Sequence, residues 1–277
     1  MRNYLSVIMH ILTLGDEGQS FLGAKWVETL LRLTPAKYKR RMALTALSWS
    51  PHYFFRKINP EYPRLPHSAF VEREFARSKT TREKLCEYVL LSHLSSTQAV
   101  LDYGCGPGFL AHCVSRHVRT VYGVDLSRGA LECARILNSS PTITFLHTTR
   151  LSEIEDCSID IAYSFAVIQH VTDSAFGKIL TAVRSKLKQG GRLIIHTALD
   201  EDGWRSEEDW RRDTSLEGRL RWKYGLHCFN RDGEAVTGMC EMAGYTSIVI
   251  QPMQDLCPEN FDEVCTQHLI CAVKGGT

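Results

Sequence analysis

The sequence predicts an α/β fold in which helices cover both faces of a mostly parallel sheet, with a helical cap before it. Two observations support this class. From residue 96 on, short apolar runs alternate with stretches of helical period, which is typical of βαβ units. In addition, Gly104, Gly106 and Gly108 follow the first apolar run, as expected of a tight turn from a strand into a helix.

The composition is that of an ordinary globular protein. The chain has 277 residues, of which 44% are hydrophobic and 23% are charged. Its formal net charge of +2 is too small to indicate a nucleic-acid partner. Its 10 cysteines show neither a C-x-x-C pair nor the Cys/His spacing of a metal site. We therefore expect reduced thiols, no metal and a cytoplasmic location.

The region before the sheet is predicted to be helical. Residues 1–14 are apolar, but the run is shorter than the roughly 20 residues that span a bilayer, and we expect an amphipathic helix there. Further helices are expected at residues 21–33, 36–47 and 70–91. No linker rich in glycine or serine follows. We therefore interpret residues 1–95 as a cap and residues 96–277 as the core.

Basic and aromatic side chains alternate over residues 36–57, and two interpretations stay open. They form either a face that contacts a membrane surface, or a solvated basic face whose aromatic residues pack in the core.

The core is predicted to contain seven strands and four helices. The strands are expected at residues 98–102, 120–125, 143–147, 158–164, 191–197, 245–251 and 267–274. The helices are expected at residues 108–116, 127–138, 173–188 and 231–243. Gly190 and Gly244 are each expected to end a helix just before a strand.

The glycine turn favours one cofactor over another. Asp102 stands two residues before the first glycine, and Asp125 ends the next strand about 20 residues later, where an acid binds a ribose diol in nucleotide-binding sheets. The dinucleotide pattern is G-x-G-x-x-G, whereas this chain has G-x-G-x-G. A carboxylate repels a pyrophosphate but attracts the ammonium of an amino acid, so the pattern favours S-adenosylmethionine (SAM) over NAD.

Four motifs in order resemble those of class I SAM-dependent methyltransferases of the small-molecule type. They are Asp-x-Gly-Cys-Gly-x-Gly, the Gly-Val-Asp strand end, and residues 158–164 and 167–171. The resemblance covers roughly residues 98–275. It implies a Rossmann-like sheet whose last pair of strands is antiparallel.

The resemblance also implies the cofactor site. Gly104 would approach the methionine portion, Asp125 would bind the ribose, and Phe165 with Ala166 would border the sulfonium. The full set of expected cofactor residues is Asp102, Gly104, Cys105, Gly106, Gly108, Asp125, Leu126, Thr149, Arg150, Phe165 and Ala166. Family members often carry an acid after the third strand for the adenine, and here Thr149 or backbone groups would take that role. Arg73 or Arg77 would meet the methionine carboxylate.

Two histidines are candidate bases for an acceptor that must lose a proton. His170 follows the fourth strand and His196 lies near the end of the fifth, and histidine titrates near neutral pH. His170 is the leading candidate, with a hydrogen-bonded core role as the alternative for each.

A long insert at residues 199–229 separates the fifth strand from its following helix. Its tryptophans and arginines suggest contact with an anionic or glycosylated acceptor, and we expect Trp204, Tyr224 and His227 to bind it. The alternative is a surface lid whose acids pair with its arginines.

These features predict a methyltransferase that transfers a methyl group from SAM to an oxygen or nitrogen of a small or medium-sized acceptor and leaves S-adenosylhomocysteine. Two alternatives remain. One is a carbon or lipid methyltransferase in peripheral contact with a membrane, and the other is a noncatalytic scaffold of the same fold. Nucleic acid is not an expected partner.

Overall fold

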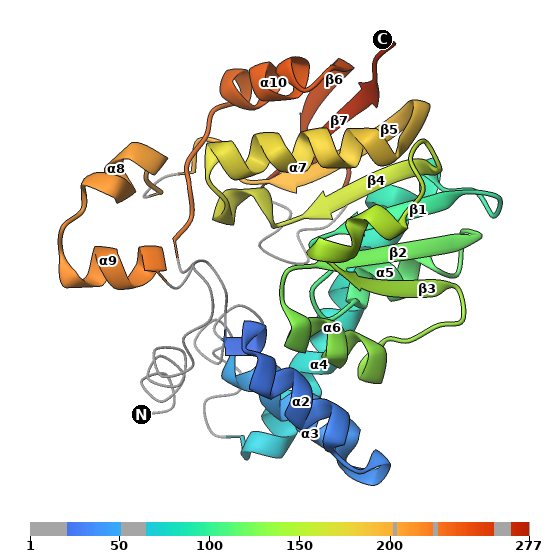
Figure 1. The fold of residues 1–277 in the computed structure, drawn as a ribbon, viewed down its shortest axis with the longest axis vertical. Coiled ribbons are helices and arrows are strands. Elements are labelled where there is room, and N and C mark those ends of the chain that lie inside the picture. Colours follow the sequence, from blue (N-terminus) through green and yellow to red (C-terminus); the bar gives the residue numbers. More distant parts are fainter. Residues whose placement is uncertain (1–20, 51–64, 202–203, 224–226, 258–266, 277) are drawn as a thin grey trace.

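Seven strands form one sheet in the order β3-β2-β1-β4-β5-β7-β6 (Figure 1). The computed structural model describes residues 21–50, 65–201, 204–223, 227–257 and 267–276. The strands are β1 (Ala99–Tyr103), β2 (Thr120–Asp125), β3 (Ile143–His147), β4 (Ile159–Phe165), β5 (Leu187–Thr197), β6 (Tyr245–Pro252) and β7 (His268–Lys274). β7 pairs antiparallel with β5 and β6, and the other pairs are parallel. The predicted sheet with an antiparallel last pair is confirmed.

The connection into β5 differs from the prediction. Helix α7 (Asp173–Lys186) ends before Gly190, and β5 already begins at Leu187. Gly190 has a left-handed φ of 72°, and the register of β5 against β4 shifts between Ile159 and Ile161. Gly190 therefore lies in a bulge of the strand and does not end the helix. Gly244, with a φ of 83°, does follow the end of helix α10 (Gly233–Met242) as predicted.

Helices bury both faces of the sheet. Successive side chains of a strand point to opposite sides, so neighbouring residues pack in different clusters. Val100 packs in a cluster with residues of α5 (Phe109–Val114) and α6 (Arg128–Leu137). Its neighbour Leu101 packs in the opposite cluster with residues of α7 and α10. Figure 1 shows α7 and α10 together along one face of the sheet.

The helices before the sheet pack on α6. They are α2 (Lys25–Leu33), α3 (Ala36–Trp49) and α4 (His67–Leu85), preceded by the short η1 (Phe21–Gly23). Buried residues of all of these share one cluster with Ala130 and Cys133 of α6. η1 and α6 approach closely at Gly129, where an added Cβ would lie 2.3 Å from the carbonyl oxygen of Leu22.

The predicted helix at residues 70–91 begins earlier and changes form along its length. α4 starts at His67, and it continues as a π-helical turn, η2 (Cys86–Leu90), and a 3₁₀ turn, η3 (Leu91–His93). The boundary of the cap at residue 95 stays a prediction. The expected helix at residues 1–14 and the aromatic residues at 53–55 lie outside the described residues.

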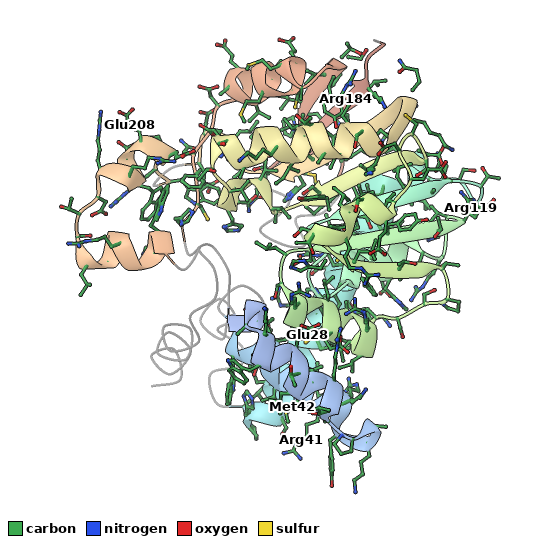
Figure 2. The ribbon with its side chains drawn as sticks, viewed as in Figure 1. Glu28, Arg41, Met42, Arg119, Arg184 and Glu208 are labelled. Carbon is green, nitrogen blue, oxygen red and sulfur yellow. The ribbon has the colours of Figure 1, made fainter. Side chains whose placement is uncertain are left out.

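The insert folds into two short helices, α8 (Glu207–Arg212) and α9 (Leu216–Lys223). Ser206 and Asp209 form a capping box at the start of α8. Glu208 lies on the side of α8 away from the sheet (Figure 2) and pairs with Arg212. The remaining short turns are η4 (Thr148–Glu153), η5 (Ile168–His170) and η6 (Met253–Asp255). Among the helices of the described residues, none is both long and apolar enough to cross a bilayer.

Candidate functional site

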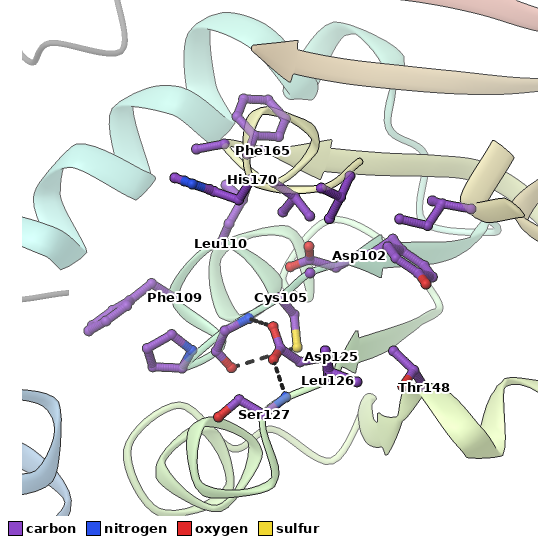
Figure 3. A pocket seen from close by; sticks show the side chains of 18 of the residues that line it. Asp102, Cys105, Phe109, Leu110, Asp125, Leu126, Ser127, Thr148, Phe165 and His170 are labelled. Atoms are coloured by element: carbon purple, nitrogen blue, oxygen red, sulfur yellow. Dashed lines mark hydrogen bonds between the residues drawn. The ribbon is translucent and has the colours of Figure 1, made fainter. Parts of the chain in front are cut away.

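A cavity of about 590 Å³ opens at the carboxyl ends of β1, β2, β3 and β4 (Figure 3). This edge is where open α/β sheets bind ligands, and the volume falls within the roughly 300 to 1,000 Å³ of small-molecule sites. Its wall combines the glycine turn after β1, the end of β2, the turn after β4, and residues of α4 and α7. The lining is largely apolar, with a few charged groups that converge on it.

The glycine turn brings its backbone against neighbouring side chains. Gly104 has a left-handed φ of 82°, and an added Cβ would lie 2.3 Å from Val167 Cγ2. The amides of Gly104 and Cys105 both donate to the carbonyl oxygen of Val124, at 2.7 and 3.1 Å. Gly108, with a φ of 77°, is the residue before α5. Only glycine adopts this conformation readily and also has no Cβ to clash with these neighbours. Without side chains at these positions, the backbone of the turn is open to a ligand on its other side.

Asp102 is a buried acid that faces this turn. Its residue is 3% exposed, and its Oδ2 has no hydrogen-bond partner among the described residues. Burial raises the pKa of Asp102 to about 8, a rise that the neighbouring Tyr163 and Arg82 partly offset. An unpartnered buried carboxyl oxygen is costly, and a cationic ligand group beside it would remove that cost.

Asp125 at the end of β2 accepts hydrogen bonds from two backbone amides (Figure 3). Its Oδ2 accepts from Gly106 at 2.8 Å, and its Oδ1 accepts from Ser127 at 2.7 Å. Burial raises the pKa of Asp125, and these amides partly offset the rise. Each carboxylate oxygen has two lone pairs, so both can accept a further bond from a ligand diol.

The adenine side of the cavity differs from the expectation at two positions. Leu126, which is 44% exposed, and Thr148 line the cavity, but Thr149 and Arg150 are not among its lining residues. Thr149 bonds to the ring of His147, and Arg150 pairs with Glu153 on the surface. The chain turns into η4 at Thr148, which directs the next two side chains away from the cavity.

Phe165 and Ala166 line the cavity after β4, as expected. Ala166 has a φ of 56°, a left-handed conformation that costs a non-glycine residue about 1 to 2 kcal/mol. Its amide donates to the carbonyl oxygen of His196 at 3.1 Å, which helps to hold this conformation.

The two candidate histidines are placed differently. His170 lines the cavity and is half-buried, and burial lowers its pKa. His196 is fully buried, and its ring stacks on Phe165 with 5.2 Å between ring centroids. His196 is not among the lining residues, so Phe165 separates its ring from the cavity.

Helix α4 contributes two lining residues that are not among the predicted site residues, Ser78 and Arg82. They are four residues apart and so share one side of the helix. Arg77, one of the two arginines expected here, donates to the buried carboxylate of Glu74. Neither Arg77 nor Arg73 lines the cavity. The spacing of Ser78 and Arg82 is visible in the sequence, but which side of α4 meets the turn depends on its packing against α5.

The described part of the insert forms an aromatic cluster outside the cavity. His227 is buried, stacks on Trp222 at 5.1 Å, and also contacts Trp210 and Phe229. Neither Trp204 nor His227 lines the cavity. Tyr224 lies outside the described residues. The acids of the insert pair with its arginines, as in Glu207 with Arg211 and Asp213 with Arg205.

The described thiols and potential metal ligands form no second site. Within the described residues, no three His, Cys, Asp or Glu side chains are grouped to hold a metal, and the nine described cysteines are free. Cys105, inside the glycine turn, is buried, and burial raises the pKa of its thiol. The thiol of Cys105 is therefore neutral, and the residue lines the cavity together with its neighbours in the turn.

Comparison with known proteins places this site in a family. Residues 101–195 match the model of a methyltransferase domain. The chain is 33% identical to N-demethylindolmycin N-methyltransferase of Streptomyces griseus over 38% of this chain and 46% of that protein. It is 32% identical to ubiquinone biosynthesis O-methyltransferase of Hahella chejuensis, over 35% of this chain and 42% of that protein. The chain thus spans less than half the length of these two curated relatives.

Solved structures share the fold at lower identity. A SAM-dependent methyltransferase from Mesorhizobium loti matches 69% of this chain and 97% of its own, with 19% identity and a TM-score of 0.50. A chain of the Haloferax volcanii complex with the Trm112 methyltransferase activator matches 74% of this chain and 95% of its own, with 12% identity and a TM-score of 0.53. The matched residues 101–195 contain the glycine turn, Asp125 and His170, and they belong to the class I SAM-dependent methyltransferase domain family.

Proposed function

We propose that this chain transfers the methyl group of SAM to an oxygen or nitrogen atom of a small acceptor. The observation that carries the proposal is that one cavity combines the acid and glycine cradle after β1 and β2 with a neutral histidine after β4. SAM, when bound, supplies a methyl group on a positively charged sulfur, which is already reactive toward a nucleophile. The chain therefore has to bind both substrates, align the acceptor atom with the methyl group, and remove the acceptor's proton.

The chain's own residues fit three parts of SAM, which are the methionine portion, the ribose and the adenine. The unpartnered oxygen of Asp102 suits the ammonium of the methionine portion, and Arg82, which also lines the cavity, suits its carboxylate. The remaining lone pairs of Asp125 suit the ribose hydroxyls. Leu126 and Thr148 would border the adenine, in place of the predicted Thr149 and Arg150.

His170 is the residue that would accept the acceptor's proton. A lowered pKa keeps its imidazole neutral at pH 7, the form that can act as a base. His196 is separated from the cavity by Phe165 and does not take this role.

The acceptor is proposed to be a small molecule with an apolar body and an anionic group. Phe109, Leu110 and Phe165 supply apolar wall. Lys178 of α7 is an exposed cation that lines the cavity and forms no ion pair with another described residue. The two curated relatives named above carry one N-methyltransferase and one O-methyltransferase name. They support acceptor atoms of these two kinds.

The test begins with a calorimetric titration of the purified chain with S-adenosylhomocysteine, and with NADH in parallel. We expect micromolar binding of the first and none of the second. A screen of phenols, amines and their carboxylated derivatives for methylated product, by mass spectrometry with labelled SAM, would then identify the acceptor. Binding of NADH alone would overturn the cofactor assignment. Tight S-adenosylhomocysteine binding without product from any acceptor class would favour the scaffold alternative.

A further inference from the structure

A short segment at the end of the insert, residues 227–231, runs against the turn that carries His170. We call it the strap. We infer that the strap is a positioning device, which fixes the orientation of the His170 ring and keeps its proton on Nδ1. The inference rests on the proposed role of His170 as the base. It adds residues outside the cavity that act on the reaction only through that histidine.

The first contact is between the His170 ring and the strap backbone. His170 Nδ1 lies 3.1 Å from the carbonyl oxygen of His227. A carbonyl oxygen only accepts, so Nδ1 must carry the proton, and Nε2 is then the nitrogen with the lone pair in the neutral ring. A base needs that lone pair, and its partner on the other nitrogen decides which tautomer is present.

A second group competes for the same nitrogen. Cys228 Sγ lies 3.6 Å from His170 Nδ1. Burial raises the pKa of Cys228 to about 11, so the sulfur keeps its proton and would donate to an unprotonated Nδ1, giving the opposite tautomer. The carbonyl is the closer partner, and a thiol is a weak donor. Geometry therefore favours the proton on Nδ1. Removing the thiol of Cys228 tests this directly, because the tautomer should not change.

Arg231 holds the turn on both sides of His170. Its Nη1 donates to the carbonyl oxygen of Ile168 at 2.8 Å, its Nη2 donates to that of Val171, and its Nε donates to Asp173 at 2.7 Å. The Arg231 residue is 8% exposed. A buried guanidinium with three planar bonds is rigid, so the backbone around His170 has little freedom to rotate the ring away.

Two more bonds tie the strap in place. The amide of Phe229 donates to the carbonyl oxygen of Gln169 at 2.7 Å, directly before His170. On the other side of the strap, Trp210 Nε1 of α8 donates to the carbonyl oxygen of Cys228 at 2.9 Å. Trp210 is buried at 8% exposure. The insert thus acts on the reaction through the bond of the Trp210 side chain to the strap backbone, although neither Trp204 nor His227 lines the cavity.

The chain offers a matched control for Arg231. Arg184 also holds backbone carbonyl oxygens, those of Gly244 at 3.1 Å and Gly275 at 3.4 Å. It lies near the end of α7 that is remote from the cavity (Figure 2). Replacing either arginine by lysine keeps the charge and loses the planar donor set. A purely structural role for Arg231 would therefore give the two variants the same effects.

The decisive measurement does not require activity. Nitrogen-15 NMR on the chain with labelled histidine rings distinguishes a protonated from an unprotonated ring nitrogen, and His170→Asn identifies the His170 signals among the 11 histidines. We expect a protonated Nδ1 and an unprotonated Nε2 in the wild type at pH 8, unchanged in Cys228→Ala. In Arg231→Lys we expect a mixture of tautomers, and in Arg184→Lys the wild-type spectrum.

The kinetic arm uses the acceptor found in the product screen. Arg231→Lys should lower kcat by about 100-fold, as a small misplacement of a reacting group can, with little change in the KM for SAM. Arg184→Lys should leave both unchanged. A proton on Nε2 in the wild type, or equal kcat values for the two lysine variants, would overturn the inference. If no acceptor is found, the NMR result decides alone, and S-adenosylhomocysteine binding reports separately on the proposed function. If Arg231→Lys does not fold, the wild-type and Cys228→Ala spectra still decide the tautomer.

Discussion

The carboxylate of Asp125 accepts a hydrogen bond of 2.8 Å from the backbone amide of Gly106, 19 positions earlier in the chain. The acid at the end of β2 therefore shapes the glycine turn as well as offering lone pairs to a ligand. In Asp125→Ala, both functions are lost. We expect S-adenosylhomocysteine binding to weaken by about 1.5 to 3 kcal/mol for each charge-assisted bond to the ribose. Calorimetry measures this loss, and unchanged affinity would remove the ribose assignment.

The unpartnered Asp102 predicts a stability that depends on pH. An aspartate in the unfolded chain loses its proton near pH 3.9, whereas burial raises the pKa of Asp102 in the fold to about 8. Stability is thus full below the unfolded pKa and declines as the pH rises to about 8. Asp102→Asn keeps the shape without the charge, so its melting temperature should rise relative to the wild type over that range and level off above it. A difference in melting temperature that does not change with pH would contradict this view.

The same residue predicts proton release when a ligand binds. An ammonium beside Asp102 favours its ionised form, so its pKa should fall on binding, and the proton that it holds at pH 7 should leave. Titrating S-adenosylhomocysteine in two buffers of different ionisation enthalpy measures this proton. Asp102→Asn should bind more weakly and abolish the buffer dependence. Proton uptake by the wild type would argue against an ammonium at this position.

His170→Ala should separate binding from chemistry. We expect S-adenosylhomocysteine affinity to stay close to wild type, while turnover falls by about 100-fold or more, because general-base catalysis contributes at least that much. Burial lowers the pKa of His170, so wild-type activity should rise with pH through a midpoint below about 6.5 and stay flat above it. Full activity in the variant would return His170 to a structural role.

Gly104→Ala should disrupt the cradle, and another glycine provides its control. The new Cβ would meet Val167 Cγ2 at 2.3 Å in a left-handed backbone conformation. We expect a clear loss of both melting temperature and S-adenosylhomocysteine affinity. At Gly177 in α7 an added Cβ meets nothing within 4 Å, so Gly177→Ala should stabilise the protein by up to about 1 kcal/mol. Equal effects of the two changes would show that space at the turn is not limiting.

Local spacing explains why much of the sheet and cradle could be predicted. The spacing of apolar residues distinguishes the strands from the helices that alternate with them. Asp102, Asp125 and the three glycines of the turn lie within or directly after the strands that position them. Thr148 lines the cavity, whereas Thr149 and Arg150 do not, because the first residue after β3 already lies in a 3₁₀ turn.

What the sequence left out depends on contacts between distant segments. Arg82 reaches the cavity because α4 packs beside α5, an arrangement that the period of one helix does not contain. The bulge at Gly190 depends on the register of β5 against β4. The bond from His170 to His227 joins residues 57 positions apart. The local sequence around either residue therefore does not predict that they meet.

The shared cluster of α2, α3, α4 and α6 bears on how small a working fragment of this protein can be. Trimming the chain to its matched residues 101–195 would remove the strap, the helix that brings Ser78 and Arg82, and the apolar partners of Ala130 and Cys133. The trimmed piece would retain every motif that identifies the family. It would nevertheless expose the apolar surface of α6 to water and leave the cavity without its wall from α4. The part of the chain that identifies the family is therefore smaller than the part that must fold together.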